Sequence, residues 1–247
     1  MVFHEWKYYV QHDPVISDYE YDQLYKMLVD LEVEYPEWIT PDSPTHRVSK
    51  DLTESFPSVA HLVPMLSLDN SYQPDHLYDF DRQVRKLTGI AEDEKIAYTV
   101  EPKVDGGSVA MIYENDKLSR AATRGDGIRG EEITNNMRAL RSVPLKVVFS
   151  KLGIKTAEVR GEALIRKDRF QMINEQSQEE GLSLFANPRN AATGALRMKD
   201  PRETANRGLE LFLFQLGYGR DENGQDILKD IGSHYEAIRS LHKLGFR

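Results

Sequence analysis

The chain has 247 residues, of which 40% are hydrophobic and 29% charged, as in a globular protein with one large core or two modest domains. Its 32 Lys and Arg against 40 Asp and Glu disfavour a stand-alone nucleic-acid binder, because phosphate contacts need clustered basic side chains. No Cys is present, no apolar run approaches the roughly 20 residues of a membrane span, and the opening MVFHEWKYYV does not read as a secretory signal. Disulfide scaffolds, cysteine zinc sites and spanning helices are therefore excluded.

The first part of the chain predicts two helices joined by a linker. Ser17 and Glu20 have the spacing of a capping box, and Pro36 ends the apolar stripe that follows them. The segment 40–51 is rich in Pro, Ser and Thr and predicts a linker. A second helix is expected over 74–87, closed by a glycine. We expect a helical subdomain over residues 1–50 and a second domain over 51–247.

The second domain mixes strand and helix patterns. Strands are predicted where apolar residues alternate or cluster, over 96–100, 109–113, 118–123, 157–165 and 209–216, with a hairpin turn at 114–116. Helices are predicted over 168–178, from Asn187 onward, and from Ser233 to Gly245. The combination favours an α+β fold with largely antiparallel sheets.

The segment Glu101-Pro102-Lys103-Val104-Asp105-Gly106 is the most informative for chemistry. A lysine nucleophile must lose its proton, which burial or neighbouring positive charge favours. K-x-D-G is a short pattern, so on residue types alone a surface lysine paired with Asp105 is the simpler interpretation.

Two further stretches carry charge in unusual surroundings. Arg124 opens a run with three glycines, where it could clamp a phosphate or simply sit solvated in a hairpin. The embedded R-G-D indicates no adhesion motif without signs of secretion. Glu162 lies within an apolar strand, where a carboxylate is costly unless paired, although an edge strand facing water also fits. The seven His show no metal-ligand spacing, and no P-loop or G-x-S-x-G is present.

Two other segments allow both a binding and a packing interpretation. Aromatic and acidic residues alternate around Asp18 and Asp22, which suits a flat cationic ring with ribose hydroxyls or an ordinary core-facing stripe. The helix expected from Asn187 presents an N-terminus that could face an anion, with Arg189 and Arg197 roughly on one face. A close-packed helix with surface arginines is the alternative.

Taken in order, these segments resemble the N-terminal adenylation region of bacterial NAD-dependent DNA ligases. The resemblance runs through ISDYEYDQLY, TPDSPTHRV, VPMLSLDN, EPKVDG, ATRGDGIRGEEITNN, VRGEA and FANPRNAATGALR, and so covers nearly the whole chain. Each motif alone is weak, but seven in family order are specific. The resemblance implies an ATP-grasp-like nucleotidyltransferase domain behind a helical subdomain that binds nicotinamide mononucleotide (NMN).

The resemblance also implies roles for individual residues. Lys103 would attack the adenylyl phosphorus of NAD and become lysyl-AMP, and Asp105 would help position the lysine or a metal. Glu162 would hold the ribose and help order hydrated Mg²⁺, with Mn²⁺ as an alternative ion and no zinc in this region. Arg189 and Arg197 would contact nicked DNA. The other implied nucleotide contacts are Tyr8, Tyr9, Asp18, Tyr19, Glu20, Tyr21, Asp22, Ser67, Leu68, Glu101, Val104, Arg124 and Phe214.

Some positions depart from the family pattern. Tyr9 stands where histidine is frequent, Gly107 replaces a usual leucine and is expected to loosen packing beside the nucleophile, and Phe214 keeps a stacking ring without a hydroxyl. The pattern of the family continues beyond Arg247 into further strands and DNA-binding domains, so we expect a truncated ligase core. We further expect a monomer in the bacterial cytoplasm, associated with the nucleoid, that serves DNA replication and repair without a membrane.

Three alternatives to an active adenylation core remain. The chain could bind NMN or NAD without turnover, could be an ATP-dependent ligase or capping relative, or could be a catalytically dead scaffold. The segment from Tyr8 to Asp22 argues against the use of ATP.

Overall fold

The computed structural model describes residues 1–11, 13–47, 53 and 55–246. Helices and strands are mixed, and every strand pairing is antiparallel, which confirms the predicted α+β class. None of the described helices is both long enough and apolar enough to cross a membrane. The helices are α1 (Val2–Glu5), α2 (Asp18–Glu34), α3 (Pro74–Thr88), α4 (Thr134–Ala139), α5 (Lys167–Glu179), α6 (Pro188–Ala195), α7 (Pro201–Asn206) and α8 (His234–Lys243). The strands are β1 (Ser58–Ala60), β2 (Gly107–Glu114), β3 (Lys117–Thr123), β4 (Arg129–Glu131), β5 (Thr156–Leu164) and β6 (Glu210–Arg220), and short helical turns lie at Trp6–Val10, Pro36–Trp38, Pro44–His46, Phe149–Leu152 and Leu228–Ile231.

Local sequence signals account for many element boundaries. The Ser17 hydroxyl accepts from the Glu20 N–H while the Glu20 carboxylate accepts from Ser17, so the predicted capping box starts α2. Gly89, at φ 73°, ends α3 in the left-handed conformation. Asn115 and Asp116 also have positive φ and form the two-residue turn of the β2–β3 hairpin.

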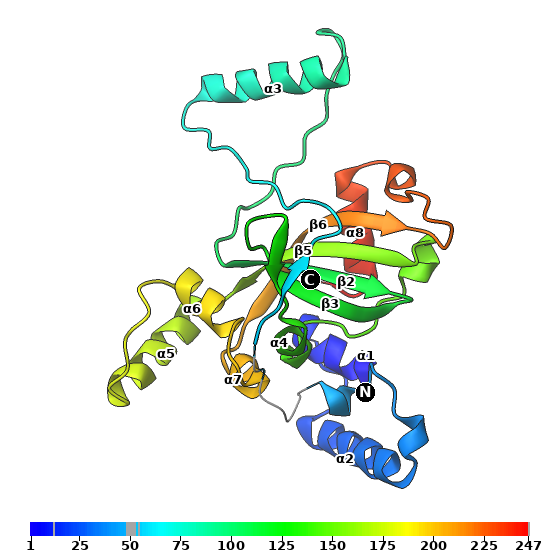
Figure 1. The fold of residues 1–247 in the computed structure, drawn as a ribbon, viewed down its shortest axis with the longest axis vertical. Helices are drawn as coiled ribbons and strands as arrows, with labels where there is room; N and C mark the ends of the chain where they lie inside the picture. The colour runs from blue at the N-terminus through cyan, green and yellow to red at the C-terminus, as the bar shows by residue number, and fades with distance from the viewer. Residues whose placement is uncertain (12, 48–52, 54, 247) are drawn as a thin grey trace.

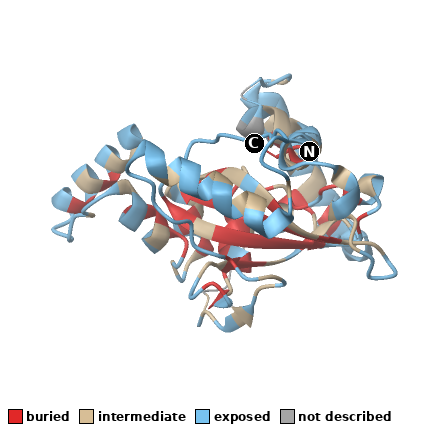
Figure 2. Ribbon diagram, turned by 90° about the horizontal axis from the view of Figure 1, so that it is seen from above, coloured by how far each residue is buried: buried red, intermediate tan, exposed pale blue. Residues whose placement is uncertain are grey.

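A four-stranded sheet in the order β3-β2-β5-β6 forms the centre of the molecule (Figure 1). Its two faces differ. Val109, Met111 and Val159 point to one face, where they join a core that also includes Leu241 of α8 and Ala192 of α6. Buried residues gather along these strands, whereas the surrounding helices are largely exposed (Figure 2). The opposite face carries the buried charged side chains of Glu158, Arg160 and Glu162.

Helix α3 stands clear of the sheet at one end of the long axis, and α2 lies at the other end (Figure 1). No residue of α3 is buried, and Leu77, Phe80 and Leu87 of its apolar stripe are more than half exposed. The segment after α3 was expected to form a strand over 96–100, and this prediction is wrong. Tyr98 instead contacts α3, with its ring against Phe80 and its hydroxyl bonded to Asp81 Oδ1 at 2.6 Å.

Candidate active site

The predicted nucleophile lies on an irregular segment that leads into β2. Lys103 and Asp105 are exposed and Val104 is half-buried, so the lysine side chain is accessible from solvent. The chain becomes buried at Gly106, just before β2 begins. The lysine is thus held a few residues from the rigid sheet.

Glu162 anchors the start of β2. It is buried near the end of β5 and pairs with Ser108 in the β2–β5 register. Its Oε1 accepts from the Gly106 N–H at 3.0 Å, and its Oε2 accepts from the Ser108 hydroxyl at 2.6 Å. A buried carboxylate is costly unless it is paired, and these two donors explain how the strand tolerates it. The predicted site residue Glu162 therefore binds the chain just after the segment that bears Lys103.

Glycine is the only residue type that fits at position 106, where the start of β2 lies against β5. A Cβ at this position would lie 2.1 Å from the carbonyl oxygen of Ala163, which is far below any real contact. A Cβ on Gly107 would come within 2.8 Å of Leu196 Cδ1. The expectation that Gly107 loosens the packing is wrong, because its missing side chain lets α6 approach the strand closely.

Arg124 lies across β2 from Glu162, at the end of β3. Its N–H donates to the Ser108 carbonyl at 3.1 Å, which continues the β2–β3 pairing. Its Nη2 donates to the Ser67 hydroxyl at 2.8 Å, so the structure joins two residues that sequence analysis assigned to one nucleotide site. Arg124 Nε is buried and has no hydrogen-bond partner within the described part of the chain. A buried donor without a partner is rare and costly in a folded protein, which makes this atom a candidate for a bond that the described residues do not supply.

A strap over residues 61–68, which includes Ser67, crosses the charged face of the sheet. Arg160 of β5 donates to the Val63 and Pro64 carbonyls at 2.6 and 3.0 Å. Glu158 accepts from the Leu62 N–H at 2.9 Å and pairs with Arg160 at 2.8 Å. Both charged residues are buried.

Sequence analysis noted only Glu162 in this strand and missed the supporting pair. The signal was available, because Glu158, Arg160 and Glu162 alternate with apolar or small residues and must share one face of a strand. His61 was also missed. Its Nε2 lies 3.0 Å from the Arg124 carbonyl oxygen, and its N–H donates to the Ile128 carbonyl.

Phe214 lies at a β-bulge in β6. Arg160 pairs with Gln215 and Gly161 pairs with Leu213, so Phe214 is the extra residue between them. A bulge redirects a side chain from the regular alternation of a strand. Phe214 is 37% exposed, which leaves its ring accessible to a planar group.

The predicted NMN-side residues have different surroundings. Asp18, Tyr19 and Asp22 are exposed on α2. The Tyr21 hydroxyl donates to Glu5 at 3.1 Å. The Glu20 carboxylate serves the capping box, and hydrogen bonds from the Ser17 backbone and side chain hold its pKa below the usual value.

Two further residues complete this group. Tyr8 is 42% exposed in the turn Trp6–Val10. Tyr9 follows it, and its side chain lies outside the described residues.

The structure does not bring the NMN-side residues to Lys103. Helix α2 lies beyond the β3 edge, away from the start of β2 (Figure 1). Arg47 links this part to the sheet domain, since it pairs with buried Glu5 at 2.9 Å and donates to the carbonyls of Arg138, Leu140 and Val143. Sequence analysis did not single out Arg47.

The two predicted DNA-contacting arginines are both paired with acids. Arg189 Nη1 lies 2.8 Å from Asp105 Oδ1, and Arg197 Nη2 lies 2.7 Å from Glu131 Oε1. Glu101 pairs with His234 of α8 at 2.8 Å. Sequence analysis predicted none of these partners, because each joins residues far apart in the chain.

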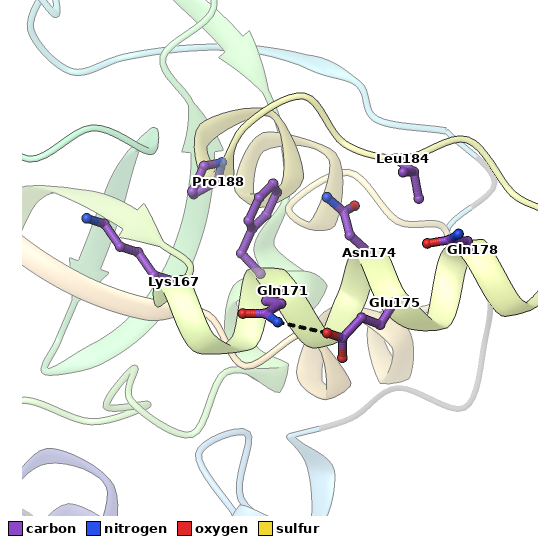
Figure 3. A pocket seen from close by; sticks show the side chains of 8 residues that line it. Lys167, Gln171, Asn174, Glu175, Gln178, Leu184 and Pro188 are labelled. Carbon is purple, nitrogen blue, oxygen red and sulfur yellow. Dashed lines mark hydrogen bonds between the residues drawn. The ribbon is translucent and has the colours of Figure 1, made fainter.

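Two other features bear on ligand binding. Among the described residues no group of three or more His, Asp or Glu could hold a metal ion. A hollow of about 510 Å³ lies between α5 and the start of α6, lined by residues that include Phe170, Asn174 and Pro188 (Figure 3). Its lining contains none of the predicted site residues, so it is separate from the site around Lys103.

The chain matches the models of two known families. Residues 53–247 match the model of the NAD-dependent DNA ligase adenylation domain. Residues 1–49 match the model of the DNA ligase-like N-terminal NAD+-binding domain.

Comparison with curated proteins points the same way. The chain is 56% identical over 246 residues to a DNA ligase of Sulfurihydrogenibium azorense, and it is 53% identical to one of Persephonella marina over 246 residues. It is 51% identical over 245 residues to a DNA ligase of Aquifex aeolicus. Each match covers 99% of this chain but only 33–34% of the relative, so the chain spans about a third of the length of these curated relatives. The chain therefore belongs to the NAD-dependent DNA ligase family, with an N-terminal NAD+-binding domain followed by an adenylation domain.

Proposed function

We propose that this chain carries out the adenylation half-reaction of an NAD-dependent DNA ligase. The Lys103 amine, after losing its proton, attacks the adenylyl phosphorus of NAD. A phosphorus–nitrogen bond forms, the bond from that phosphorus to the NMN phosphate oxygen breaks, and NMN leaves. The product is lysyl-AMP on the protein.

One observation supports this assignment most strongly. Glu162 binds both the Gly106 N–H and the Ser108 hydroxyl, so the segment that bears Lys103 is fixed at the end of the sheet where Arg124 also ends β3. Displacement at phosphorus needs an aligned nucleophile and groups that neutralise charge on the phosphate. Arg124, whose buried Nε lacks a partner among the described residues, supplies a cation beside the start of β2.

We propose the remaining contacts from the family resemblance. Ser67 and Leu68 would contact the nucleotide from the strap, Glu101 and Val104 from the lysine segment, and Phe214 would stack on the adenine from its bulge. Glu162 would accept from the ribose. The aromatic and acidic residues of Tyr8 to Asp22 would hold the leaving NMN. These residues lie beyond the β3 edge, so we propose that residues 1–50 move relative to 51–247 before transfer (Figure 1). This movement would require the bonds from Arg47 to the carbonyls of the sheet domain to open.

We propose that a magnesium ion would be held near Glu162 and Asp105 through water molecules, without direct bonds to these acids. The Glu162 oxygens accept hydrogen bonds from Gly106 and Ser108, and Asp105 is paired with Arg189, so these acids do not form a direct ligand set. When bound, the metal would neutralise phosphate charge. The protein groups named in the step above all belong to this chain.

The complete enzyme would act on DNA. We propose that the lysyl-AMP formed here serves the sealing of nicked double-stranded DNA in replication and repair, with Arg189 and Arg197 as phosphate contacts. A monomer in the bacterial cytoplasm, in contact with the nucleoid, suits this role.

The intact mass of the purified chain tests the proposal after incubation with magnesium and either NAD or ATP. We expect a gain of one AMP with NAD alone, abolished in Lys103→Ala and kept in Lys95→Ala, which removes a neighbouring exposed lysine. AMP transfer from ATP would contradict the proposed cofactor. NAD binding by calorimetry without any transfer would favour the alternative of a binding module.

A further inference from the structure

The segment that bears Lys103 has neither helix nor strand structure, yet three side chains from three elements hold it. His234 of α8 binds Glu101, Arg189 of α6 binds Asp105, and Glu162 of β5 binds the Gly106 N–H. The Arg189 contact lies two residues from the nucleophile. It is therefore placed to influence where the lysine amine points.

Arg189 lies in the first turn of α6, and hydrogen bonds hold the residues around this turn in place. The Asn187 side chain caps α6 by accepting from the Asn190 N–H at 2.8 Å, and Pro188 occupies the first turn. The Asn174 amide donates to the Phe185 carbonyl and accepts from the Phe185 N–H, which fixes the loop before the cap. Figure 3 shows Asn174 and Pro188 on the two sides of the hollow between α5 and α6.

The far end of α6 is held as well. Buried Asn136 donates to the carbonyls of Leu196 and Met198, and Ala191, Ala192 and Ala195 pack into the core. A helix fixed at both ends presents Arg189 in a defined place. Its partner Asp105 gains a fixed anchor on an otherwise irregular segment.

We propose that Arg189 is a positioning residue for the adenylation step itself, in addition to any contact with DNA. It holds Asp105, and through Asp105 it limits the movement of the segment that carries Lys103. Since attack at phosphorus requires the amine in line within about 3–3.5 Å, a less restrained segment reacts more slowly. This inference rests on the proposed function, and it predicts that Arg189 matters when no DNA is present.

The first test measures the rate of AMP transfer from NAD without DNA. Each chain accepts one AMP in this assay, so the readouts are the maximal single-turnover rate constant and the NAD concentration that gives half of it. We expect Arg189→Gln to lower the rate constant about fivefold with little change in that concentration, because an exposed ion pair contributes a modest amount and Arg189 is not one of the proposed NAD contacts. Arg189→Lys should restore part of the rate. The Arg189→Gln/Asp105→Asn double variant should be no slower than Asp105→Asn alone, since each change removes the same contact between Arg189 and Asp105.

Arg202→Gln is the matched control. Arg202 follows a proline at the start of α7, as Arg189 does in α6, and it pairs with Asp200 at 2.7 Å on an exposed surface. It should leave the transfer rate unchanged. Equal rates for wild type and Arg189→Gln, or equal losses in both arginine variants, would overturn the inference.

Amide hydrogen exchange of the unliganded chain gives a second readout that does not depend on activity. Exchange over residues 99–106 should be faster in Arg189→Gln than in wild type and unchanged in Arg202→Gln. Unchanged exchange in Arg189→Gln would overturn the inference. If the wild-type chain takes up no AMP, the proposed function fails, and the exchange result still decides whether Arg189 holds this segment.

Discussion

Replacing Arg160 by methionine tests how the strap is attached to the sheet. Arg160 and Glu158 are buried, and breaking such a pair from one side costs roughly 3–5 kcal/mol of the free energy of unfolding, because the remaining charge is uncompensated. The Val63 and Pro64 carbonyls would also lose their donor, at about 1 kcal/mol each if water does not replace it. We therefore expect Arg160→Met to lower the unfolding free energy by about 3–5 kcal/mol if water reaches the two carbonyls, and by up to about 7 kcal/mol if it does not.

Removing both charges should be far less harmful. In Glu158→Leu/Arg160→Met no buried charge is left alone, so most of the lost stability should return. Arg120→Met is the matched control, since Arg120 lies on the same face and donates to the Ala60 carbonyl at 3.1 Å, with no buried acidic partner in the described part of the chain. Its cost should be about 1 kcal/mol or less.

Urea denaturation followed by circular dichroism measures these differences, and hydrogen exchange over residues 61–68 reports release of the strap. A double variant as unstable as Arg160→Met alone would refute the reasoning, as would an Arg160→Met variant within about 1 kcal/mol of wild type.

Two other changes test the site more locally. Gly106→Ala should slow AMP transfer by at least about 100-fold, because its Cβ would meet the Ala163 carbonyl and displace the Lys103 segment; a rate near wild type by intact mass would contradict this. Asp126 accepts from the N–H groups of Arg129 and Ile128, which lower its pKa, so its contribution to the turn is complete above the ordinary Asp value of about 4 and is lost as pH falls through the lowered pKa. The two amide resonances should therefore titrate below that value in wild type and not in Asp126→Asn, and titration at the ordinary value would be inconsistent with the bonds.

Much of the fold could be predicted because its signals are local. Ser17 with Glu20, Asn187 with Pro188, and Ser233 at the start of α8 each cap a helix where the sequence indicates one. The strand expected over 96–100 shows the limit of such signals. Alternation indicates a two-sided segment, but a strand forms only with a neighbour, and Tyr98 contacts α3 instead.

The site could be predicted in its parts but not in its connections. Lys103, Arg124 and Glu162 were selected by residue type and by resemblance, and the structure brings the last two to either side of β2. The pairs that hold them, such as Asp105 with Arg189, join positions more than 50 residues apart. Such contacts depend on how the strands and helices pack, which no local pattern specifies.

The alternation of charge along β5 has a consequence for folding. Val159, Gly161 and Ala163 face the core, whereas Glu158, Arg160 and Glu162 face the strap and the site. A slip of one residue in the pairing of β5 would turn all three charges into the apolar core and expose the residues that now fill it. Each unpaired buried charge costs several kcal/mol, so misaligned sheets are strongly disfavoured. The residues that build the nucleotide face thus also select the correct strand alignment while the protein folds.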